Sequence, residues 1–463
     1  MNRIADSHPE VIYIDCTETF FSGLNTGIQR VVNELIHRTP MLGQSVGIPC
    51  IPVVGLGGRY YSLDNVQKVH GRFQKSLLRI KHCLRDHYYW ARSKKKPERF
   101  SNHAHTITPQ EIQKDDRFLS KVESWIRNFV GQSFSLVQRQ GPLFAIRLSV
   151  SPLYLDDHVL LLVPDGFSGR YYDLNALENA FYRGVTIIPL IHDLIPITHP
   201  EVAHEENIRT YAKKLDQVLS RASGIMTVSK SVKESLEHYI SKTAPKHSGL
   251  PIRFFYLGAD FSPKETSETI RYQYINEVLS EIYRQRFYLL VGTIEPRKGH
   301  LTAIEAFYNL WSENFDANLV LVGRVGWKCE NILREIERVS LKYNRLFFLQ
   351  DLGDRELAEL YSRASALILP SLTEGFGLPL VEAMHFGIPV IASDIPIFRE
   401  IGGDYPLYFE VGSPSDLAVK LKVIDMADPS TKKTTTKWTS WDESALSYIQ
   451  VALEIYQSSC KGA

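Results

Sequence analysis

The stretch that decides the fold runs Phe287-Tyr-Leu-Leu-Val-Gly-Thr-Ile-Glu-Pro-Arg-Lys-Gly299. It begins as an apolar run of strand length and ends as a glycine-bounded loop in which Arg297 and Lys298 are adjacent. In open α/β sheets, ligands bind just outside the carboxyl ends of the strands. Adjacent cations there suit a diphosphate, because arginine offers a planar fork of donors and lysine a compact charge. Taken alone, this motif is more typical of a charged surface turn.

A second motif favours a ligand-binding site over a surface turn. The apolar run 366–369 leads into the segment Pro370-Ser-Leu-Thr-Glu-Gly-Phe-Gly-Leu-Pro-Leu-Val-Glu-Ala-Met-His-Phe-Gly387. Gly375 and Gly377 allow the backbone to approach a ligand, while Pro379 suits the first turn of a helix. The free N–H groups at such a helix start form an anion site. Glu382 is expected in the first turn, either as a ligand of sugar hydroxyls or as a capping carboxylate.

Outward from these motifs, apolar runs of strand length alternate with stretches of helical spacing. This pattern predicts an α/β fold with parallel sheets that are covered on both faces. A chain of 463 residues exceeds the roughly 250 to 300 residues of a single core, so two doubly wound domains are expected. The predicted strand and helix pairs are 11–14 with 28–36, 185–191 with 205–220, 224–228 with 230–240, 287–291 with 300–312, 319–322 with 329–342, and 366–369 with 379–386.

The seam between the domains is expected around 256–285, where turn residues and charge occur without an apolar period. The predicted domains are 1–260, with a basic insertion at about 60–140, and 261–440. The last helix, within 441–463, is expected to pack back on the first domain.

Glu374 and Glu382 are spaced as the E-x7-E signature, and the motifs above resemble those of retaining GT-B glycosyltransferases of family 4, also called group 1. Thr26-Gly-Ile-Gln-Arg-Val-Val32 and Ile191-His-Asp-Leu-Ile-Pro196 are similar to segments of bacterial O-antigen and capsule mannosyl- or rhamnosyltransferases. The resemblance implies a GT-B fold, in which two Rossmann-like domains face a cleft, the first binding the acceptor and the second the nucleotide sugar.

Carried over to this chain, the resemblance implies that Arg297 and Lys298 bind the donor diphosphate and that Glu382 accepts hydrogen bonds from the ribose. Glu374 would orient the sugar together with the amides of Gly375, Phe376 and Gly377. His192 would lie beside the transferred sugar, a role that competes with a structural one, whereas Asp193 more plausibly holds local backbone. The remaining residues expected at the donor are Gly27, Gly292, Gly323, Leu352 and Leu378.

The expected reaction moves a hexose from a sugar nucleotide, GDP-mannose first, then dTDP-rhamnose or a UDP-sugar, to a saccharide or lipid-linked saccharide. The two cations and the helix start would stabilise the departing diphosphate, so neither a metal ion nor a cofactor is expected. Asp156-Asp157 is only a weak metal candidate, since no residue separates the pair. Three alternatives are an inactive sugar-nucleotide-binding scaffold, an epimerase or phosphorylase of the same fold, and an oxidoreductase. The oxidoreductase is disfavoured because Gly55-Leu-Gly-Gly58 lacks the third glycine of its motif.

A net charge of +1 gives no reason to expect nucleic acid as a partner, and five scattered cysteines without a C-x-x-C argue against a disulfide framework. No signal-peptide core or bilayer-length apolar run occurs, so a cytoplasmic location is expected. One segment is unusual: 68–99 holds eleven Lys or Arg against two acidic residues. Within it, 72–84 has the spacing of a basic amphipathic helix, which either contacts an anionic inner membrane face or packs as a solvated helix.

Overall fold

The computed structural model describes residues 8–23, 26–71, 143, 146–147, 149–167, 169–203, 205–260, 269–426 and 438–461. The chain divides into two compact units. The larger comprises Met1–Ile51, Leu155–Tyr172 and Ala180–Ala463, and the smaller comprises Pro52–Tyr154 and Asp173–Asn179. The predicted basic helix at 72–84 lies outside the described residues.

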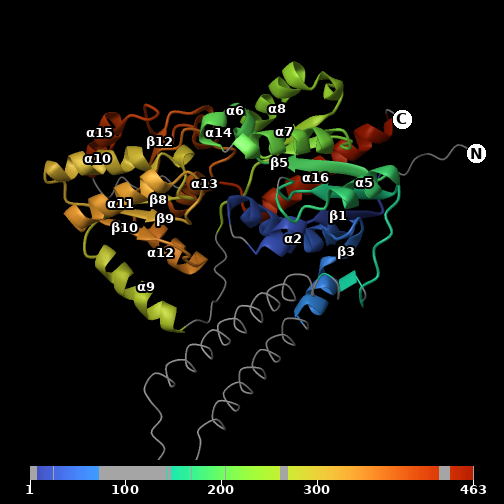
Figure 1. The fold of residues 1–463 in the computed structure, drawn as a ribbon, viewed down its shortest axis with the longest axis horizontal. Helices are drawn as coiled ribbons and strands as arrows, with labels where there is room; N and C mark the ends of the chain where they lie inside the picture. The colour runs from blue at the N-terminus through green and yellow to red at the C-terminus, as the bar shows by residue number, and fades with distance from the viewer. Residues whose placement is uncertain are drawn as a thin grey trace, which may run out of the picture. The chain divides into compact units, whose positions relative to one another are not determined.

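The larger unit contains a first parallel sheet with the strand order β1-β4-β5-β6-β7. Of these strands, β1 and β5 are labelled in Figure 1. Its strands are β1 (Val11–Asp15), β4 (Val159–Val163), β5 (Thr186–Ile191), β6 (Ile225–Thr227) and β7 (Ile252–Phe254). Every residue of β4 is buried, as expected for a central strand covered on both faces.

Helices connect these strands in the alternation that the sequence predicts. They are α1 (Thr17–Ser22), α2 (Gly27–Ser45), α6 (Ile195–Thr198), α7 (Glu205–Leu219) and α8 (Lys230–Thr243), with the short 3-10 helices η1 (Pro200–Val202) and η2 (Pro245–His247). In α2, one stripe of apolar side chains is buried and includes Val31, Val32 and Leu35.

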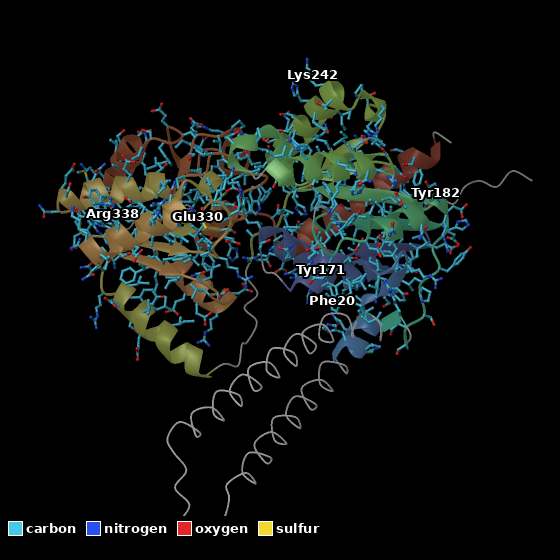
Figure 2. All side chains as sticks on the ribbon, viewed as in Figure 1. Phe20, Tyr171, Tyr182, Lys242, Glu330 and Arg338 are labelled. Atoms are coloured by element: carbon cyan, nitrogen blue, oxygen red, sulfur yellow. The ribbon has the colours of Figure 1, made fainter. Side chains whose placement is uncertain are left out.

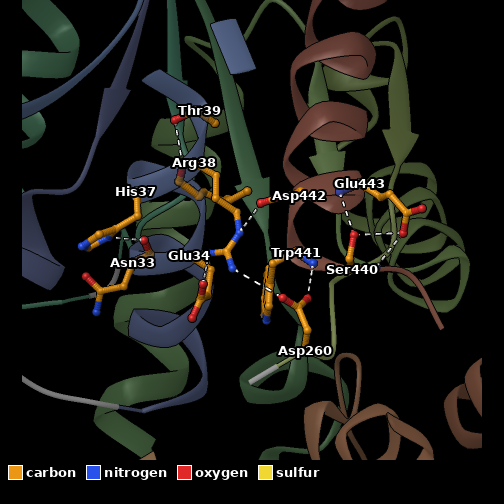
Figure 3. Close-up of polar contacts among 11 residues, drawn as sticks. Asn33, Glu34, His37, Arg38, Thr39, Asp260, Ser440, Trp441, Asp442 and Glu443 are labelled. Carbon is orange, nitrogen blue, oxygen red and sulfur yellow. Dashed lines mark hydrogen bonds and ion pairs between the residues drawn. The ribbon is translucent and has the colours of Figure 1, made fainter. Parts of the chain in front are cut away.

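The last helix, α16 (Trp441–Lys461), packs against α2 and β7. Arg38 of α2 forms ion pairs with Asp442 at 2.7 Å and with Asp260 at 3.6 Å. Asp260 also accepts a hydrogen bond from the backbone N–H of Trp441, so one cluster joins the start of α16 to α2 (Figure 3). Gly258 permits this contact, because a Cβ there would lie 2.4 Å from the Trp441 nitrogen.

A second sheet in the same unit is also parallel throughout, with the order β10-β9-β8-β11-β12-β13. Its strands are β8 (Phe287–Val291), β9 (Asn318–Val322), β10 (Leu346–Leu349), β11 (Ala366–Leu369), β12 (Val390–Ser393) and β13 (Leu407–Phe409). Tyr288 and Leu290 belong to one core layer, and the intervening Leu289 is buried on the opposite face. Both faces are therefore covered, which explains why nearly every position of these strands is apolar.

The helices of this half are α9 (Thr269–Ile282), η3 (Pro296–Lys298), α10 (His300–Ser312), α11 (Glu330–Tyr343), α12 (Asp354–Arg363), α13 (Leu378–Phe386), α14 (Pro396–Gly402) and α15 (Pro414–Met426). In α11, Ile332 and Ile336 are buried, whereas Glu330 and Arg338, labelled in Figure 2, are exposed. Among the described residues, no helix combines the length and the apolar character needed to cross a bilayer.

Most predicted elements are confirmed to within one or two residues, and those at 287–291, 300–312 and 366–369 match without a shift. The helices predicted at 28–36 and 230–240 are too short, because α2 continues to Ser45 and α8 to Thr243. Within the expected seam at 256–285, α9 occupies Thr269–Ile282, so the second half of this stretch is helical although no apolar period was found in it. The domain boundaries stay a prediction. Of the strands in the two parallel sheets, β4, β7, β10, β12 and β13 are absent from the predicted set.

The smaller unit contains an antiparallel pair formed by β2 (Cys50–Gly55), which starts in the larger unit, and β3 (Tyr60–Ser62). Residues 63–71 then form a helix. A further helix, α5 (Leu174–Tyr182), has residues in both units.

Candidate active site

A cavity of about 690 Å³ lies within the larger unit, and residues that follow strands of both sheets line it. Every residue that the sequence nominated for the site is on its wall: Gly27, His192, Gly292, Arg297, Lys298, Gly323, Leu352, Glu374, Gly375, Phe376, Gly377, Leu378 and Glu382. These residues span most of the chain, so the tertiary fold has gathered separate motifs into one place.

The strand order explains why the loop that carries the two cations lies next to the glycine-rich loop. Chain order reverses between β8 and β11, which are neighbours in the second sheet although β9 and β10 separate them in sequence. Such a reversal leaves a crevice at the carboxyl ends of the two strands, where α/β proteins bind ligands. The loop carrying Arg297 and Lys298 follows β8, and the loop carrying Glu374 follows β11.

The two loops contact each other through their backbones. Gly299 has a φ of 67°, and a Cβ there would lie 1.9 Å from the carbonyl oxygen of Pro370. The backbone N–H of Leu372 donates to the carbonyl oxygen of Arg297 at 2.7 Å. A glycine at position 299 is therefore required both by the left-handed conformation and by the close approach of the second loop.

Arg297 and Lys298 converge on one carboxylate. Arg297 donates through a terminal nitrogen to Glu374 Oε2 at 2.8 Å, and the Lys298 Nζ donates to Glu374 Oε1 at 2.5 Å. Ser371 Oγ donates to the same Oε1 at 2.8 Å, and the Nε of Arg297 lies 2.6 Å from Glu295 Oε1. Two cations and two carboxylates thus form a cluster of balanced charge at the cavity wall.

Burial and the two cations act on the pKa of Glu374 in opposite directions. Burial would raise it, but Lys298 and Arg297 more than offset that effect and lower the pKa to about 2. Burial also raises the pKa of Glu295, and Arg297 and Lys298 only partly oppose the change. Glu374 is consequently ionised at neutral pH and holds both cations in place.

His192 follows β5 and is a half-buried residue of the cavity wall. Its Nε2 lies 2.7 Å from the carbonyl oxygen of Pro164, and because a carbonyl only accepts, Nε2 carries the proton. Burial lowers the pKa of His192, although Pro164 and Asp193 oppose the shift, so the imidazole is neutral near pH 7. The assigned tautomer leaves Nδ1 as a hydrogen-bond acceptor.

The glycine loop after β11 approaches His192 at backbone distance. A Cβ on Gly375 would lie 2.2 Å from the carbonyl oxygen of His192 and 3.1 Å from the Cβ of Asp193. Ser229 Oγ, which also caps α8, donates to the carbonyl oxygen of Gly375 at 3.0 Å. The expected local role of Asp193 is confirmed, because its Oδ1 accepts from the backbone N–H of Ile195 at 3.0 Å.

Glu382 is placed differently from the sequence expectation. The helix begins at Leu378, after Gly377 in the left-handed conformation, so Glu382 falls beyond its first turn and caps nothing. Its side chain is buried, and its Oε1 pairs with Arg30 at 2.7 Å while its Oε2 accepts from the Tyr361 hydroxyl at 2.7 Å. The capping interpretation of Glu382 is therefore wrong.

Sequence reasoning missed the partners of the nominated residues. Arg30 lies within the Thr26–Val32 motif, so its position near Gly27 could have indicated that it belongs to the site. Glu295 is buried, and the only sequence signal for it was its position in the Glu-Pro-Arg-Lys-Gly loop. The weak metal candidate, Asp156-Asp157, precedes β4 and is not on the cavity wall. It therefore lies at the opposite edge of the first sheet from the carboxyl ends that the cavity uses.

Comparison with known proteins finds relatives among the glycosyltransferases. Residues 276–432 match the family model described as Glycosyl transferases group 1. The chain is 34% identical over 262 residues to the serotype-specific mannosyltransferase WbdA of Escherichia coli, a match that covers 55% of this chain and 32% of that protein. It is 28% identical over 232 residues to O-antigen chain mannosyltransferase B of Escherichia coli, covering 49% of this chain and 57% of that one.

Among solved structures, sucrose-phosphate synthase from Thermosynechococcus elongatus superposes with a TM-score of 0.50 at 17% identity, covering 97% of this chain and 94% of the other. The fold is therefore that of the GT-B glycosyltransferases. Within it, residues 276–432 form a group 1 glycosyltransferase domain, which confirms the resemblance inferred from the motifs. The aligned part of the chain spans about a third of the length of WbdA.

Proposed function

We propose that the chain is a retaining glycosyltransferase that transfers a hexose from a sugar nucleotide to a saccharide or lipid-linked saccharide in surface polysaccharide synthesis. The observation that carries this proposal is the cavity at the β8–β11 reversal, where Arg297, Lys298 and the start of α13 face one space. GDP-mannose is the first candidate donor, since the named relatives include mannosyltransferases of O-antigen synthesis.

The donor half of the site is proposed to be 261–440, and the acceptor half 1–260 together with 441–463. The acceptor is proposed to approach from the side of His192, whose Nδ1 is positioned by the Pro164 contact to accept from a sugar hydroxyl. Gly27 is proposed to bring backbone close to the donor, in keeping with the open space around the position of its Cβ. A lipid-linked acceptor would place the enzyme peripherally at the inner membrane face, with the segment 72–84 as the proposed contact.

The chemical problem is the negative charge that develops on the β-phosphate as the sugar leaves. Arg297 uses three of its five N–H donors, two on carboxylates and one on the carbonyl oxygen of Thr373, and therefore keeps two for a diphosphate. Lys298 uses one of its three donors on Glu374 and keeps two. Pre-oriented donors at developing charge are worth about 3 kcal/mol each. Glu374 is proposed to hold these cations as well as to orient the sugar, and Glu382 to accept from the ribose.

Retention is proposed to follow from attack of the acceptor hydroxyl on the same face of the sugar, with the departing phosphate assisting removal of the hydroxyl proton. The bond between the anomeric carbon and the phosphate oxygen breaks, and the bond to the acceptor oxygen forms. Glu374 is engaged with two cations and Ser371, which makes it a poor candidate for a covalent nucleophile.

The proposed function is tested by offering purified protein a panel of GDP-mannose, dTDP-rhamnose and UDP-glucose. The true donor should raise the melting temperature, because a ligand that binds only the folded state stabilises it. Release of nucleoside diphosphate should then require an acceptor, which separates a transferase from an epimerase or hydrolase. Binding without transfer to any saccharide acceptor would favour the inactive scaffold, and binding of none of the three would overturn the proposal.

Transfer should also survive chelation. Arg297, Lys298 and the start of α13 are proposed to supply the positive charge that a metal ion would otherwise provide. The rate of transfer in excess EDTA should therefore stay within about twofold of the untreated rate. A rise of about 1.4 kcal/mol in the activation free energy would already lower the rate tenfold. The rate is measured as nucleoside diphosphate release before and after chelation, and again after adding Mg²⁺. Loss of transfer in EDTA with recovery in Mg²⁺ would rule out the metal-independent mechanism.

A further inference from the structure

One buried ion pair at the cavity joins helices that belong to different sheets. Arg30 lies in the first turn of α2, after β1 of the first sheet, and its backbone N–H donates to Thr26. Its terminal nitrogen lies 2.7 Å from Oε1 of Glu382, which α13 of the second sheet carries. The exposed fraction is 18% for the Arg30 side chain and 4% for that of Glu382, so water contributes little to either charge.

The second oxygen of the same carboxylate is also engaged. Tyr361, on α12, donates its hydroxyl to Oε2 of Glu382 at 2.7 Å and is fully buried. Three helices thus hold one carboxylate, each oxygen of which keeps a further lone pair for another donor. Both Arg30 and Glu382 are on the cavity wall.

The charge of Arg30 matters to what Glu382 can accept. A phenol alone would leave the buried Glu382 carboxylate without a counter-charge, and an unpaired buried charge is costly. The Arg30 guanidinium supplies that counter-charge at 2.7 Å, and its contact with Oε1 fixes the direction in which the remaining lone pairs of the carboxylate point. An arginine on α2 therefore orients a hydrogen-bond acceptor on α13.

We propose that Arg30 is a positioning residue for the nucleotide, holding the Glu382 carboxylate through the 2.7 Å ion pair in the orientation in which it accepts hydrogen bonds from the ribose hydroxyls of a nucleoside diphosphate. This inference rests on the proposed function, which assigns Glu382 to the ribose. It adds that the half of the molecule assigned to the acceptor sets part of the affinity for the donor nucleotide, because the supporting charge comes from α2.

The test compares GDP with 2′,3′-dideoxy-GDP, which lacks the hydroxyls, by calorimetry on the intact protein. If uridine or thymidine nucleotides prevail in the donor panel, the corresponding pair with and without ribose hydroxyls is used. Wild type should favour the hydroxylated nucleotide by about tenfold or more, the range expected for hydrogen bonds to a charged group. In Arg30→Ala this ratio should fall at least fivefold, because the loss falls on the hydroxylated nucleotide only.

Arg38→Ala is the matched control, since it removes an ion-paired arginine from the same helix at the α16 contact, away from the cavity. It should leave the ratio unchanged even if it lowers the melting temperature. Arg30→Lys should restore part of the ratio, and in a Glu382→Gln background Arg30→Ala should have no further effect on it. Should Arg30→Ala not fold, Arg30→Lys and Tyr361→Phe must each reduce the ratio.

An equal loss of affinity for both nucleotides in Arg30→Ala would overturn the inference and leave Arg30 a structural residue. A wild-type protein that binds both nucleotides equally would overturn it too. In either case the assignment as a glycosyltransferase survives, since nucleotide binding itself is observed. Equal binding by the wild type would remove only the assignment of Glu382 to the ribose. Failure to bind any nucleotide would instead refute the proposed function.

Discussion

Lys298→Ala should lower the turnover of sugar transfer at least tenfold while the protein remains folded. The side chain contributes one of the two cations beside the developing charge on the leaving diphosphate, and loss of one such donor costs about 3 kcal/mol of transition-state stabilisation. Glu374 keeps Arg297 and Ser371 as partners in this variant, so the fold should tolerate it. The measurements are kcat for nucleoside diphosphate release and the melting temperature.

The matched control is Lys242→Ala, which removes an exposed lysine at the end of α8 and should change neither quantity (Figure 2). Arg297→Ala should slow transfer by at least as much but also lower stability, because Glu295 is completely buried and would lose its cationic partner. Breaking a buried pair in this way costs about 3 to 5 kcal/mol. Unchanged turnover in both variants would refute the assignment of the diphosphate to these cations.

Gly375→Ala should reduce turnover by tenfold or more, through geometry and not through charge. The added methyl group would lie 2.2 Å from the carbonyl oxygen of His192, and neither backbone can yield without moving its loop. The loop after β11 would therefore shift away from the loop after β5, and a displacement of about 1 Å at a reacting centre can cost about 100-fold in rate. Steady-state kinetics with the donor identified in the panel measure the effect.

Gly249→Ala provides the control for the general cost of replacing a glycine. That residue is exposed in the turn after η2, and a Cβ there meets no atom within 4 Å. It should leave turnover unchanged. Gly375→Ala with wild-type turnover would show that the close approach of the two loops has no part in the reaction.

The donor motifs were predictable because each is local. A strand of apolar residues, a glycine-bounded loop and the following helix lie within a few residues of one another, and backbone preferences alone locate them. Thus η3 (Pro296–Lys298) and α13 (Leu378–Phe386) form where the proline and glycine positions indicate. The roles of Arg297, Lys298, Glu374 and His192 in the reaction stay predictions.

Other features were not local and escaped sequence reasoning. Helix α9 (Thr269–Ile282) lies where turn residues and charges suggested only a linker, since its apolar period is weak. The start of α13 at Leu378 moved Glu382 out of the first turn, because Gly377 takes the left-handed conformation immediately before it. The partner of Glu382 is Arg30, a residue 352 positions away in sequence, and no local pattern could pair them.

The sequence by itself determined the alternating α/β class, the two loop motifs and the residue types able to hold a diphosphate, because these depend on local propensity and periodicity. Only the tertiary structure decided that β8 and β11 are neighbours, and hence that Arg297 and Lys298 meet Glu374. Strand order depends on how helices pack over a sheet, which involves contacts between distant parts of the chain. The same long-range packing sets Gly375 against His192 and Arg30 against Glu382, and so completes the site.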